Sequence, residues 1–501
     1  MTRASPGTPN GPQPATPLNA AVPGAVFRRT VRVPFSEPEM EAANATPHPA
    51  ESSPALTKAI RSLRQEVATL VGGGGSGGTL GGSVARRVEV PVDGAEPLAF
   101  LAAQRPGSRA YFRTRDGVVA IAVVGAARTF DSPAESELLE LLAADLSITA
   151  LLIGRFDGER EPGIEWEPFG RTQVIVPAIE LRRVADRTTL AATLVGDGQA
   201  TLEVLQRLEG AEHVHDPEAS VPEYTPGFGA ELGIDSSEDA WNVAVQATLN
   251  EIASGSVRKI VLARTRTFRL AEPADPCELL SRLGESEPGT YQFMIEPAPG
   301  VAFVGASPER LFRRAGLFLE SEAVAGTRPR GETPEADGSH AEGLFASEKD
   351  RREHALVLDR IRERLTDVVD SLRVARGARL LRLARVQHLC TPVDAVLRPG
   401  VGDAELLARL HPTPAVCGQP AERARTIIRA CEPFDRGLYA GPIGLLGAMT
   451  EVCVGIRSAL VLGDSVIAFA GAGIVAGSDA HAEWRETEHK LATIERLVRP
   501  S

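Results

Sequence analysis

Short strand-like segments joined by hairpin turns are the feature that most constrains the fold of this chain. Residues 109–125 (RAYFRTRDGVVAIAVVG) predict a hairpin with an Asp-Gly turn. Further strands are predicted at 150–156 and 172–177. Hairpins are frequent and the chain lacks a regular strand–helix–strand rhythm. The sequence therefore predicts an α+β fold with a large, mostly antiparallel sheet.

Helices and strands alternate irregularly in the second half of the chain. Residues 236–255 predict a helix with a serine N-cap, an acidic first turn and a glycine stop. We expect a long helix at 341–373 and a final helix at 481–498, besides one at 133–144 in the first half. The expected strands of the second half lie at 257–268, between 291 and 326, near 380–389, at 452–462 and at 466–475.

The chain has 501 residues, which is enough for a large core. Residues 1–55 hold 11 of the 37 prolines and predict a disordered tail. Residues 56–85 predict a short helix and a glycine-rich linker. We expect one folded domain over 86–498, with a strand-rich part at 86–230 and a motif-bearing part at 231–498.

Charge and cysteine content exclude several classes of protein. The net charge of −12 argues against a nucleic-acid surface. Five scattered cysteines without a CxxC pair fit reduced thiols better than disulfides or a zinc site. The longest apolar stretch, 466–477, is too short and glycine-rich to cross a membrane. We expect a cytoplasmic protein that binds neither membranes nor nucleic acid; the arginine-bearing, acid-poor start leaves an organelle transit peptide as the alternative.

Lysine is scarce in this chain. Of the 54 basic residues only four are lysine, so 50 are arginine. A lysine retained against this bias is expected where a compact charge or a releasable proton is needed, which arginine cannot supply. The alternative is chance survival. The four lysines are Lys58, Lys259, Lys349 and Lys490.

Two predicted helices carry carboxylates beside their apolar faces. On the final helix, Glu483, Glu486 and Lys490 fall within a narrow arc that adjoins the apolar stripe. This position favours a partly buried ionic site over the alternative, a surface salt bridge between residues four apart.

The long predicted helix repeats the arrangement. Asp350 and His354 project onto its apolar stripe and Glu353 lies at the edge, while Lys349 points elsewhere. The stripe consists of Val357, Leu358, Ile361, Leu365, Val368 and Leu372. Carboxylates on a buried side need a cation. Oxygen donors from two helices predict a Mg²⁺ site, and the lack of nearby His or Cys clusters argues against zinc.

Arginine and glycine motifs add to this pattern. The arginines of AGTRPRG (325–331) and GIRSALV (455–461) indicate an anionic ligand. The glycines of GPIGLLG (441–447) and AGAGIVAG (470–477) let the backbone approach a ligand closely.

Nine blocks in one order between residues 257 and 491 resemble the signature blocks of the chorismate-utilising enzymes, which include isochorismate, salicylate, anthranilate and aminodeoxychorismate synthases. The resemblance to isochorismate synthases of the menaquinone pathway extends more loosely from about residue 57. The blocks are RKIVLAR, GASPERLF, AGTRPRG, ASEKDRREH, HLCTPV, LHPTPAVCG, EPFDRGLYAGPIG, VGIRSALV and AGAGIVAGSDAHAEWRETEHKL.

The resemblance implies a deep chorismate site in a single α+β domain, and it implies roles for individual residues. Lys259 matches the base that deprotonates the attacking water, and Glu309 matches the acid that protonates the departing C4 hydroxyl. Glu353 and Glu486 match direct Mg²⁺ ligands, and Asp350 and Glu483 match the acids that hold its waters. The implied substrate contacts are Gly326, Thr327, His388, Tyr439, Arg457, Gly471 and Lys490.

The expected activity is therefore Mg²⁺-dependent conversion of chorismate to isochorismate, an isomerase reaction. Lys259 favours water over ammonia as the nucleophile, and no glutamine amidotransferase subunit is expected as a partner. A salicylate synthase, which would also eliminate pyruvate, is the first alternative, because Cys390 lies where residue size tunes that step. A catalytically silent chorismate-binding protein is the second alternative. Menaquinone and siderophore pathways both remain open.

Overall fold

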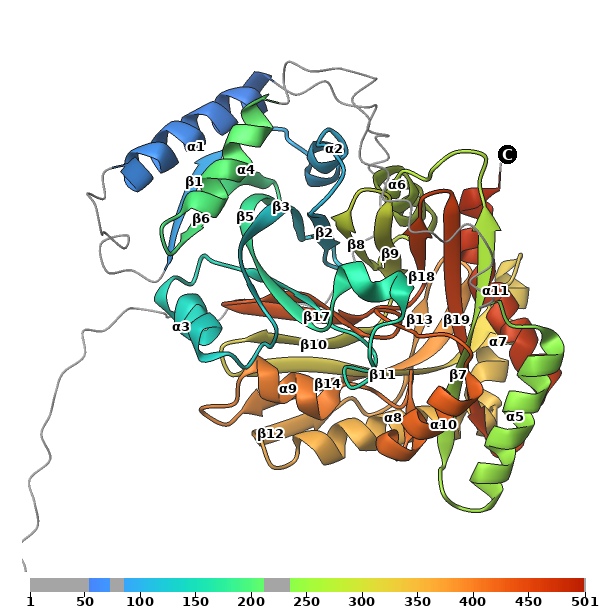
Figure 1. The fold of residues 1–501 in the computed structure, drawn as a ribbon. Helices are drawn as coiled ribbons and strands as arrows, with labels where there is room; N and C mark the ends of the chain where they lie inside the picture. Colours follow the sequence, from blue (N-terminus) through green and yellow to red (C-terminus); the bar gives the residue numbers. More distant parts are fainter. Residues whose placement is uncertain (1–53, 73–84, 211–234, 500–501) are drawn as a thin grey trace, which may run out of the picture. The chain divides into compact units, whose positions relative to one another are not determined.

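The computed structural model describes residues 54–72, 85–210 and 235–499 (Figure 1). Nearly all of the predicted disordered tail and of the predicted glycine-rich linker lies outside these residues. Helices and strands are mixed along the chain, as the sequence predicts.

The strands of the described residues form one 19-stranded sheet in which all pairs are antiparallel. This confirms the predicted α+β class. The strands are β1 (Ala85–Pro91), β2 (Arg109–Arg113), β3 (Val119–Phe130), β4 (Ala150–Ile153), β5 (Gln173–Val184), β6 (Arg187–Val195), β7 (Lys259–Arg269), β8 (Tyr291–Ala298), β9 (Val301–Ser307), β10 (Arg310–Ala315), β11 (Phe318–Pro329), β12 (Val369–Val374), β13 (Arg379–Arg382), β14 (Val386–Leu397), β15 (Gly418–Gln419), β16 (Pro442–Leu446), β17 (Met449–Val454), β18 (Ser458–Leu462) and β19 (Ser465–Val475).

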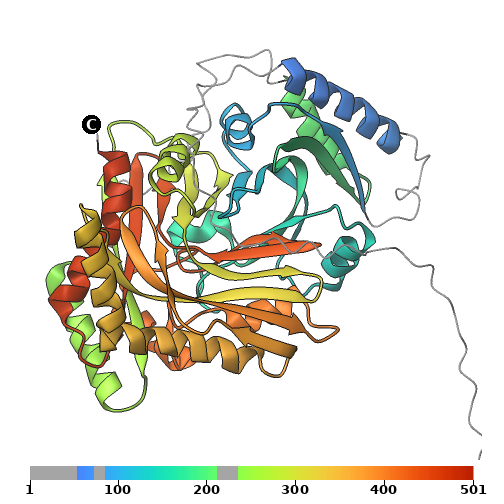
Figure 2. The ribbon, with the colours of Figure 1, turned by 180° about the vertical axis from the view of Figure 1, so that it is seen from behind.

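The helices of the described residues lie around this sheet. They are α1 (Pro54–Gly72), α2 (Pro97–Ala102), α3 (Ser136–Ala144), α4 (Gln199–Gly210), α5 (Glu238–Ala253), α6 (Pro276–Ser286), α7 (Pro334–Ala346), α8 (Glu348–Leu365), α9 (Asp403–Leu410), α10 (Ala421–Cys431) and α11 (Ala480–Val498), with a 3-10 helix at Ile164–Phe169. Helix α11 packs on β19, and helix α8 packs on β11. Figure 2 shows α8 running along β11.

The strand pairings form two runs that meet at β5. The first run is β15–β7–β19–β18–β9–β8–β2–β3–β5–β6–β1. The second run is β4–β16–β17–β10–β11–β14, with β12 and β13 on the far edge of β14. Strand β5 pairs with β3 along one edge and with both β6 and β4 along the other, which joins the runs.

Two apolar cores follow from the alternation of side chains along the strands. Ile467 and Phe469 of β19 belong to a core that takes residues from strands of both runs. Val466 and Ala468 face the opposite way, into a core shared with α1, α2, α4, α6 and α11. The first run of the sheet is thus covered by apolar side chains on both faces.

The predicted long helix at 341–373 is wrong. Ser347 ends α7 and begins α8, because its side chain accepts a hydrogen bond from the Asp350 amide and caps a new helix. Helix α8 ends at Leu365, a turn follows at 366–368, and β12 then begins at Val369 and pairs with β14. Val368 and Leu372 therefore do not belong to the helical stripe, although the rest of that stripe lies on α8.

Other predicted elements are confirmed or divided. The hairpin at 109–125 is present as β2 and β3, and the helix at 236–255 as α5. The predicted strand at 452–462 is two strands, β17 and β18, separated by a sharp break at 455–457. All five cysteines are free. No described helix combines the length and apolar character needed to cross a bilayer.

Candidate active site

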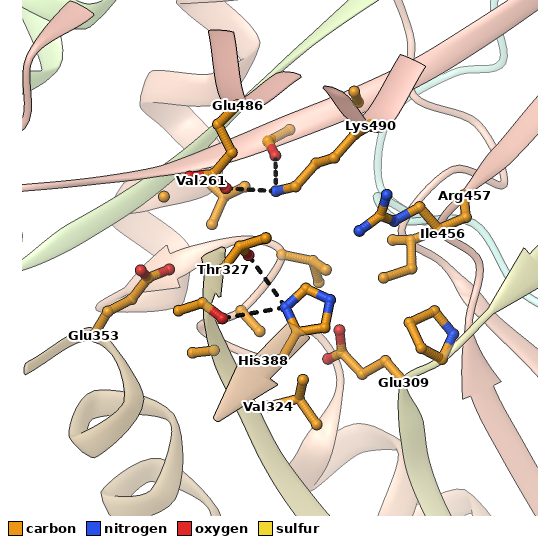
Figure 3. Close-up of a pocket in the computed structure, with 18 of the residues that line it drawn as sticks. Val261, Glu309, Val324, Thr327, Glu353, His388, Ile456, Arg457, Glu486 and Lys490 are labelled. Atoms are coloured by element: carbon orange, nitrogen blue, oxygen red, sulfur yellow. Dashed lines mark hydrogen bonds and ion pairs between the residues drawn. The ribbon is translucent and has the colours of Figure 1, made fainter. Parts of the chain in front are cut away.

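A cavity lies where α8 and α11 meet strands of both runs. It encloses about 720 Å³ of empty space, its open mouth included. Ten of the thirteen residues expected at the site line this cavity. They are Glu309, Gly326, Thr327, Glu353, His388, Tyr439, Arg457, Gly471, Glu486 and Lys490. Figure 3 labels all of these except Gly326, Tyr439 and Gly471.

The other three expected residues lie directly behind this lining. Lys259 contacts Glu353, and Asp350 and Glu483 precede Glu353 and Glu486 by three residues on α8 and α11. Side chains three apart share a helix face, so each helix directs one carboxylate into the cavity and holds a second beside it. The structure thus brings all thirteen residues into one region.

Both helices begin at the site. Ser347 caps α8 and Asp479 caps α11, each accepting a hydrogen bond from an amide of the first turn. Asp350 and Glu483 lie in the first turns of α8 and α11, where the helix dipole stabilises negative charge, and Glu353 and Glu486 lie about one turn further along.

Each carboxylate faces a basic side chain. The pairs are Glu353–Lys259 at 2.8 Å, Glu486–Lys490 at 2.7 Å, Asp350–Arg328 at 2.7 Å and Glu483–Lys349. Within the described ranges, no three His, Cys, Asp or Glu side chains form a group that could hold a metal ion. In this arrangement, protein cations neutralise the acids.

The helical projection predicts that Lys349 points away from the site, and this prediction is wrong. Its ammonium contacts Glu483. Burial alone lowers the pKa of Lys349, but the carboxylates of Glu483, Glu353 and Glu486 outweigh burial and raise it above its ordinary value. A lysine near a helix start has a stem long enough to reach across to the neighbouring helix, which periodicity does not register. The scarcity of lysine in the chain was the sequence feature that could have indicated a role for Lys349 at the site.

Lys259 begins β7 and is fully buried. Its Nζ lies 2.8 Å from Glu353 Oε1 but makes no well-directed hydrogen bond to any of the described residues. The amine is therefore shielded from solvent and next to the cavity lining. This agrees with the expectation that Lys259 has a use beyond surface charge.

Glu309 follows β9 and is also buried. Thr413 Oγ1 donates to its Oε1 at 3.3 Å. Burial raises the pKa of Glu309 to about 7; the hydrogen bond from Thr413 opposes this rise, and the negative charge of Glu322 adds to it. A carboxyl group with such a pKa keeps its proton available for donation near neutral pH.

His388 is a neutral imidazole. Burial lowers its pKa to about 3, with Arg457 contributing. Its Nδ1 lies 3.1 Å from both the Gly326 carbonyl and Thr327 Oγ1. Because a carbonyl only accepts hydrogen bonds, we assign the proton to Nδ1, which leaves Nε2 as an acceptor.

Gly326 permits a close approach of α8 to β11. It has φ of +76° at the irregularity in the β11–β14 pairing, a conformation that favours glycine. A Cβ there would also lie 3.1 Å from the Cβ of Asp350. The glycine therefore sets the distance between this strand and the acidic helix.

The other side of the cavity is rich in donors. Arg457 occupies the break between β17 and β18 with φ of +53°, a strained conformation for an arginine that is typical of functional sites. Lys490 donates to the Gly471 carbonyl at 2.7 Å. Burial raises the pKa of Tyr439 to about 12, so its phenol stays protonated. Figure 3 shows Arg457 and Glu353 at opposite sides of the space, with His388 between them.

This arrangement can bind an anion and move protons. Arg457, Lys490 and Tyr439 supply charge-assisted donors for a carboxylate. Lys259 and Glu309 supply a potential base and acid. Sequence reasoning missed two supporting residues, Thr413 and Gly473; both lie within motifs that it identified, but their contacts depend on the tertiary structure.

Comparisons with known proteins agree with the site. Residues 82–499 match the family described as chorismate binding enzyme. Isochorismate synthase MenF of Haemophilus influenzae is 33% identical over 407 residues, which cover 81% of this chain and 90% of that protein. The chloroplastic isochorismate synthase of Catharanthus roseus is 34% identical over 398 residues, covering 76% of this chain and 69% of that protein.

Among solved structures, the menaquinone-specific isochorismate synthase MenF from Escherichia coli superimposes with a TM-score of 0.74. The two chains are 27% identical, and the match covers 89% of this chain and 100% of the other.

Proposed function

The chain belongs to the family of chorismate binding enzymes, and on that premise we propose that it is an isochorismate synthase. It adds water at C2 of chorismate and removes the C4 hydroxyl, which makes it an isomerase. The names of its relatives support this reaction. The observation that carries the proposal is a buried amine at Lys259 and a buried, protonatable carboxyl at Glu309 beside one cavity.

The proposed chemistry divides between the two groups. Lys259 takes a proton from the water that attacks C2, and Glu309 gives a proton to the hydroxyl that leaves C4. Arg457, Lys490 and Tyr439 bind substrate carboxylate. The neutral His388 lies beside the ring and accepts a hydrogen bond. Arginine at position 259 could not act as a base, because it does not lose its proton in proteins.

We propose Mg²⁺ as the cofactor, held by Glu353 and Glu486, with Asp350 and Glu483 binding its water molecules. The donor set fits, because Mg²⁺ prefers carboxylate oxygens and water. The Lys349 ammonium already lies in the field of three of these acids, so the group of carboxylates attracts positive charge. When bound, Mg²⁺ would supply a positive centre for a substrate carboxylate.

Incubation of the purified chain with chorismate and Mg²⁺, followed by chromatography, tests the proposal. We expect isochorismate without pyruvate, and no conversion in excess chelator. Salicylate with pyruvate would instead identify a salicylate synthase. Tight chorismate binding without any product would identify a silent binding protein.

The physiological setting is also proposed. A relative described as menaquinone-specific supports a role in menaquinone rather than siderophore synthesis, which the neighbouring genes would test. We propose that the enzyme works in the cytoplasm and without a glutamine amidotransferase subunit. Ammonia added to the assay in place of glutamine should therefore produce no anthranilate.

A further inference from the structure

We propose that Arg115 and Glu322 form a buried ion pair that positions the carboxyl group of Glu309 for proton transfer. The inference deepens the proposed function and rests on the assignment of Glu309 as the acid. Arg115 lies in the turn between β2 and β3, and Glu322 lies on β11, so this pair connects the strand-rich first part of the chain to the cavity.

The pair contacts the residues on both sides of Glu309. The Arg115 guanidinium donates to Glu322 Oε1 at 2.6 Å and to Oε2 at 3.0 Å, and also to the Pro308 carbonyl at 2.8 Å. Glu322 Oε1 in turn accepts from the Arg310 amide at 3.3 Å. A two-pronged contact of this kind fixes orientation as well as distance.

The backbone of Glu309 itself is held at two further points. Its amide donates to Ser307 Oγ at 3.2 Å, and its carbonyl accepts from the Val454 amide at 3.1 Å. The side chain of Glu309 therefore extends from a segment whose every residue from 307 to 310 is bonded to a neighbour. Loss of the ion pair would release the two flanking contacts at once.

Cys390, from the HLCTPV block, completes the surroundings of Glu322. Its Sγ lies 3.8 Å from Glu322 Oε2. Burial raises the pKa of Cys390 to about 12, so its thiol stays protonated and can donate to the carboxylate. Burial opposes ionisation of Glu322, but Arg115 and Arg310 together lower its pKa below the ordinary value. Glu322 is thus a buried anion that is surrounded by a guanidinium, a backbone amide and a thiol as hydrogen-bond donors.

The charge of Glu322 also acts on Glu309. A negative charge near a carboxyl group disfavours its ionisation, and Glu322 contributes in this direction to the raised pKa of Glu309, after burial. The titratable and charged groups that face Glu309 are Lys259 of β7, Glu322 of β11, Tyr439, Cys453 of β17 and Lys490 of α11. The positive charges of Lys259 and Lys490 lower the pKa of Glu309 and so oppose the effect of Glu322.

A purely structural pair is the alternative, because breaking any buried ion pair destabilises a fold. Arg109 and Glu296 offer a matched control, since they form a comparably buried pair on β2 and β8 whose residues do not line the cavity. Glu322→Gln and Glu296→Gln each remove the buried negative charge that pairs with a guanidinium. The two variants should lose thermal stability alike and differ only in catalysis.

The experiment measures kcat, the KM for chorismate and the pH profile of the full chain with saturating Mg²⁺. For Glu322→Gln we expect kcat to fall by about 10- to 100-fold while KM changes by less than about threefold. The decline of kcat with rising pH should begin at a lower pH, because loss of the negative charge lowers the pKa of Glu309. Glu296→Gln should keep the wild-type kcat and pH profile.

Wild-type kcat and pH profile in folded Glu322→Gln would overturn the inference. If Glu322→Gln does not fold, Arg115→Lys is the deciding variant. Lysine keeps the positive charge but cannot reach both carboxylate oxygens of Glu322 and the Pro308 carbonyl. A loss of kcat in this variant supports the positioning role, and a wild-type kcat overturns it. Glu309→Gln separates the two proposals. High activity in that variant refutes the proposed acid itself, whereas an inactive Glu309→Gln beside a fully active Glu322→Gln refutes only the positioning.

Discussion

Replacing Gly473 with alanine should disable the enzyme while leaving the fold intact. Gly473 lies on β19 and lines the cavity, opposite Glu353. A Cβ at this position would lie 2.4 Å from Glu353 Oε1 and 3.0 Å from the Cε of Lys259. Ordinary contacts of this type begin at 3.4 Å, so the carboxylate would have to retreat by about 1 Å.

The atom in conflict is the end of a flexible side chain, not backbone. Glu353 can move aside, although its ion pair with the buried Lys259 resists the movement, and we expect the free energy of unfolding to fall by about 1–3 kcal/mol. Catalysis is less tolerant, because a displacement of about 1 Å at a reacting group can cost about 100-fold in rate. Glu353 contacts Lys259 at 2.8 Å, so its retreat disturbs both the proposed base and the proposed metal ligand.

The assay compares Gly473→Ala with Gly343→Ala by kcat, Mg²⁺ dependence and thermal unfolding. Gly343 lies within α7, and a Cβ there meets nothing within 4 Å, so this control should keep its kcat and gain up to about 1 kcal/mol of stability. We expect a kcat about 100-fold lower and weaker Mg²⁺ binding for Gly473→Ala only. Wild-type kcat with unchanged Mg²⁺ dependence would refute the reasoning.

Further predictions concern the charged groups of the site. Lys259→Ala should abolish water addition but keep Mg²⁺-dependent chorismate binding, measured by calorimetry; near-normal turnover would contradict its role as base. Glu486→Gln should weaken Mg²⁺ binding by at least about tenfold, and an unchanged affinity would argue against ligation. Lys349→Met, which removes an internal competitor for the acids, should tighten Mg²⁺ binding severalfold and lower the melting temperature in chelator. Because the acid must carry its proton, kcat should fall as pH rises through the pKa of Glu309, about 7; a flat profile from about pH 6 to about 9 would count against this assignment.

The sequence by itself determined the class of fold and predicted most of the residues that surround the cavity. The Asp-Gly hairpin and the alternating apolar segments predicted an antiparallel sheet, because these are local patterns that one turn or one strand satisfies alone. The position of Glu483 and Glu486 beside an apolar stripe predicted a buried ionic site, because helical periodicity is also local. The order of the signature blocks then identified residues such as Lys259 that no periodicity distinguishes.

Only the tertiary structure decided which charges meet. Ser347 divided the predicted long helix, since a cap outweighed a continuous apolar period. Lys349 of α8 contacts Glu483 of α11, which lies 134 residues further along the chain, and Arg115 contacts Glu322, which lies 207 residues further along. Such contacts follow from the register of paired strands and from helices packed on them. Register is a property of the assembled sheet, and a short segment of sequence does not contain it.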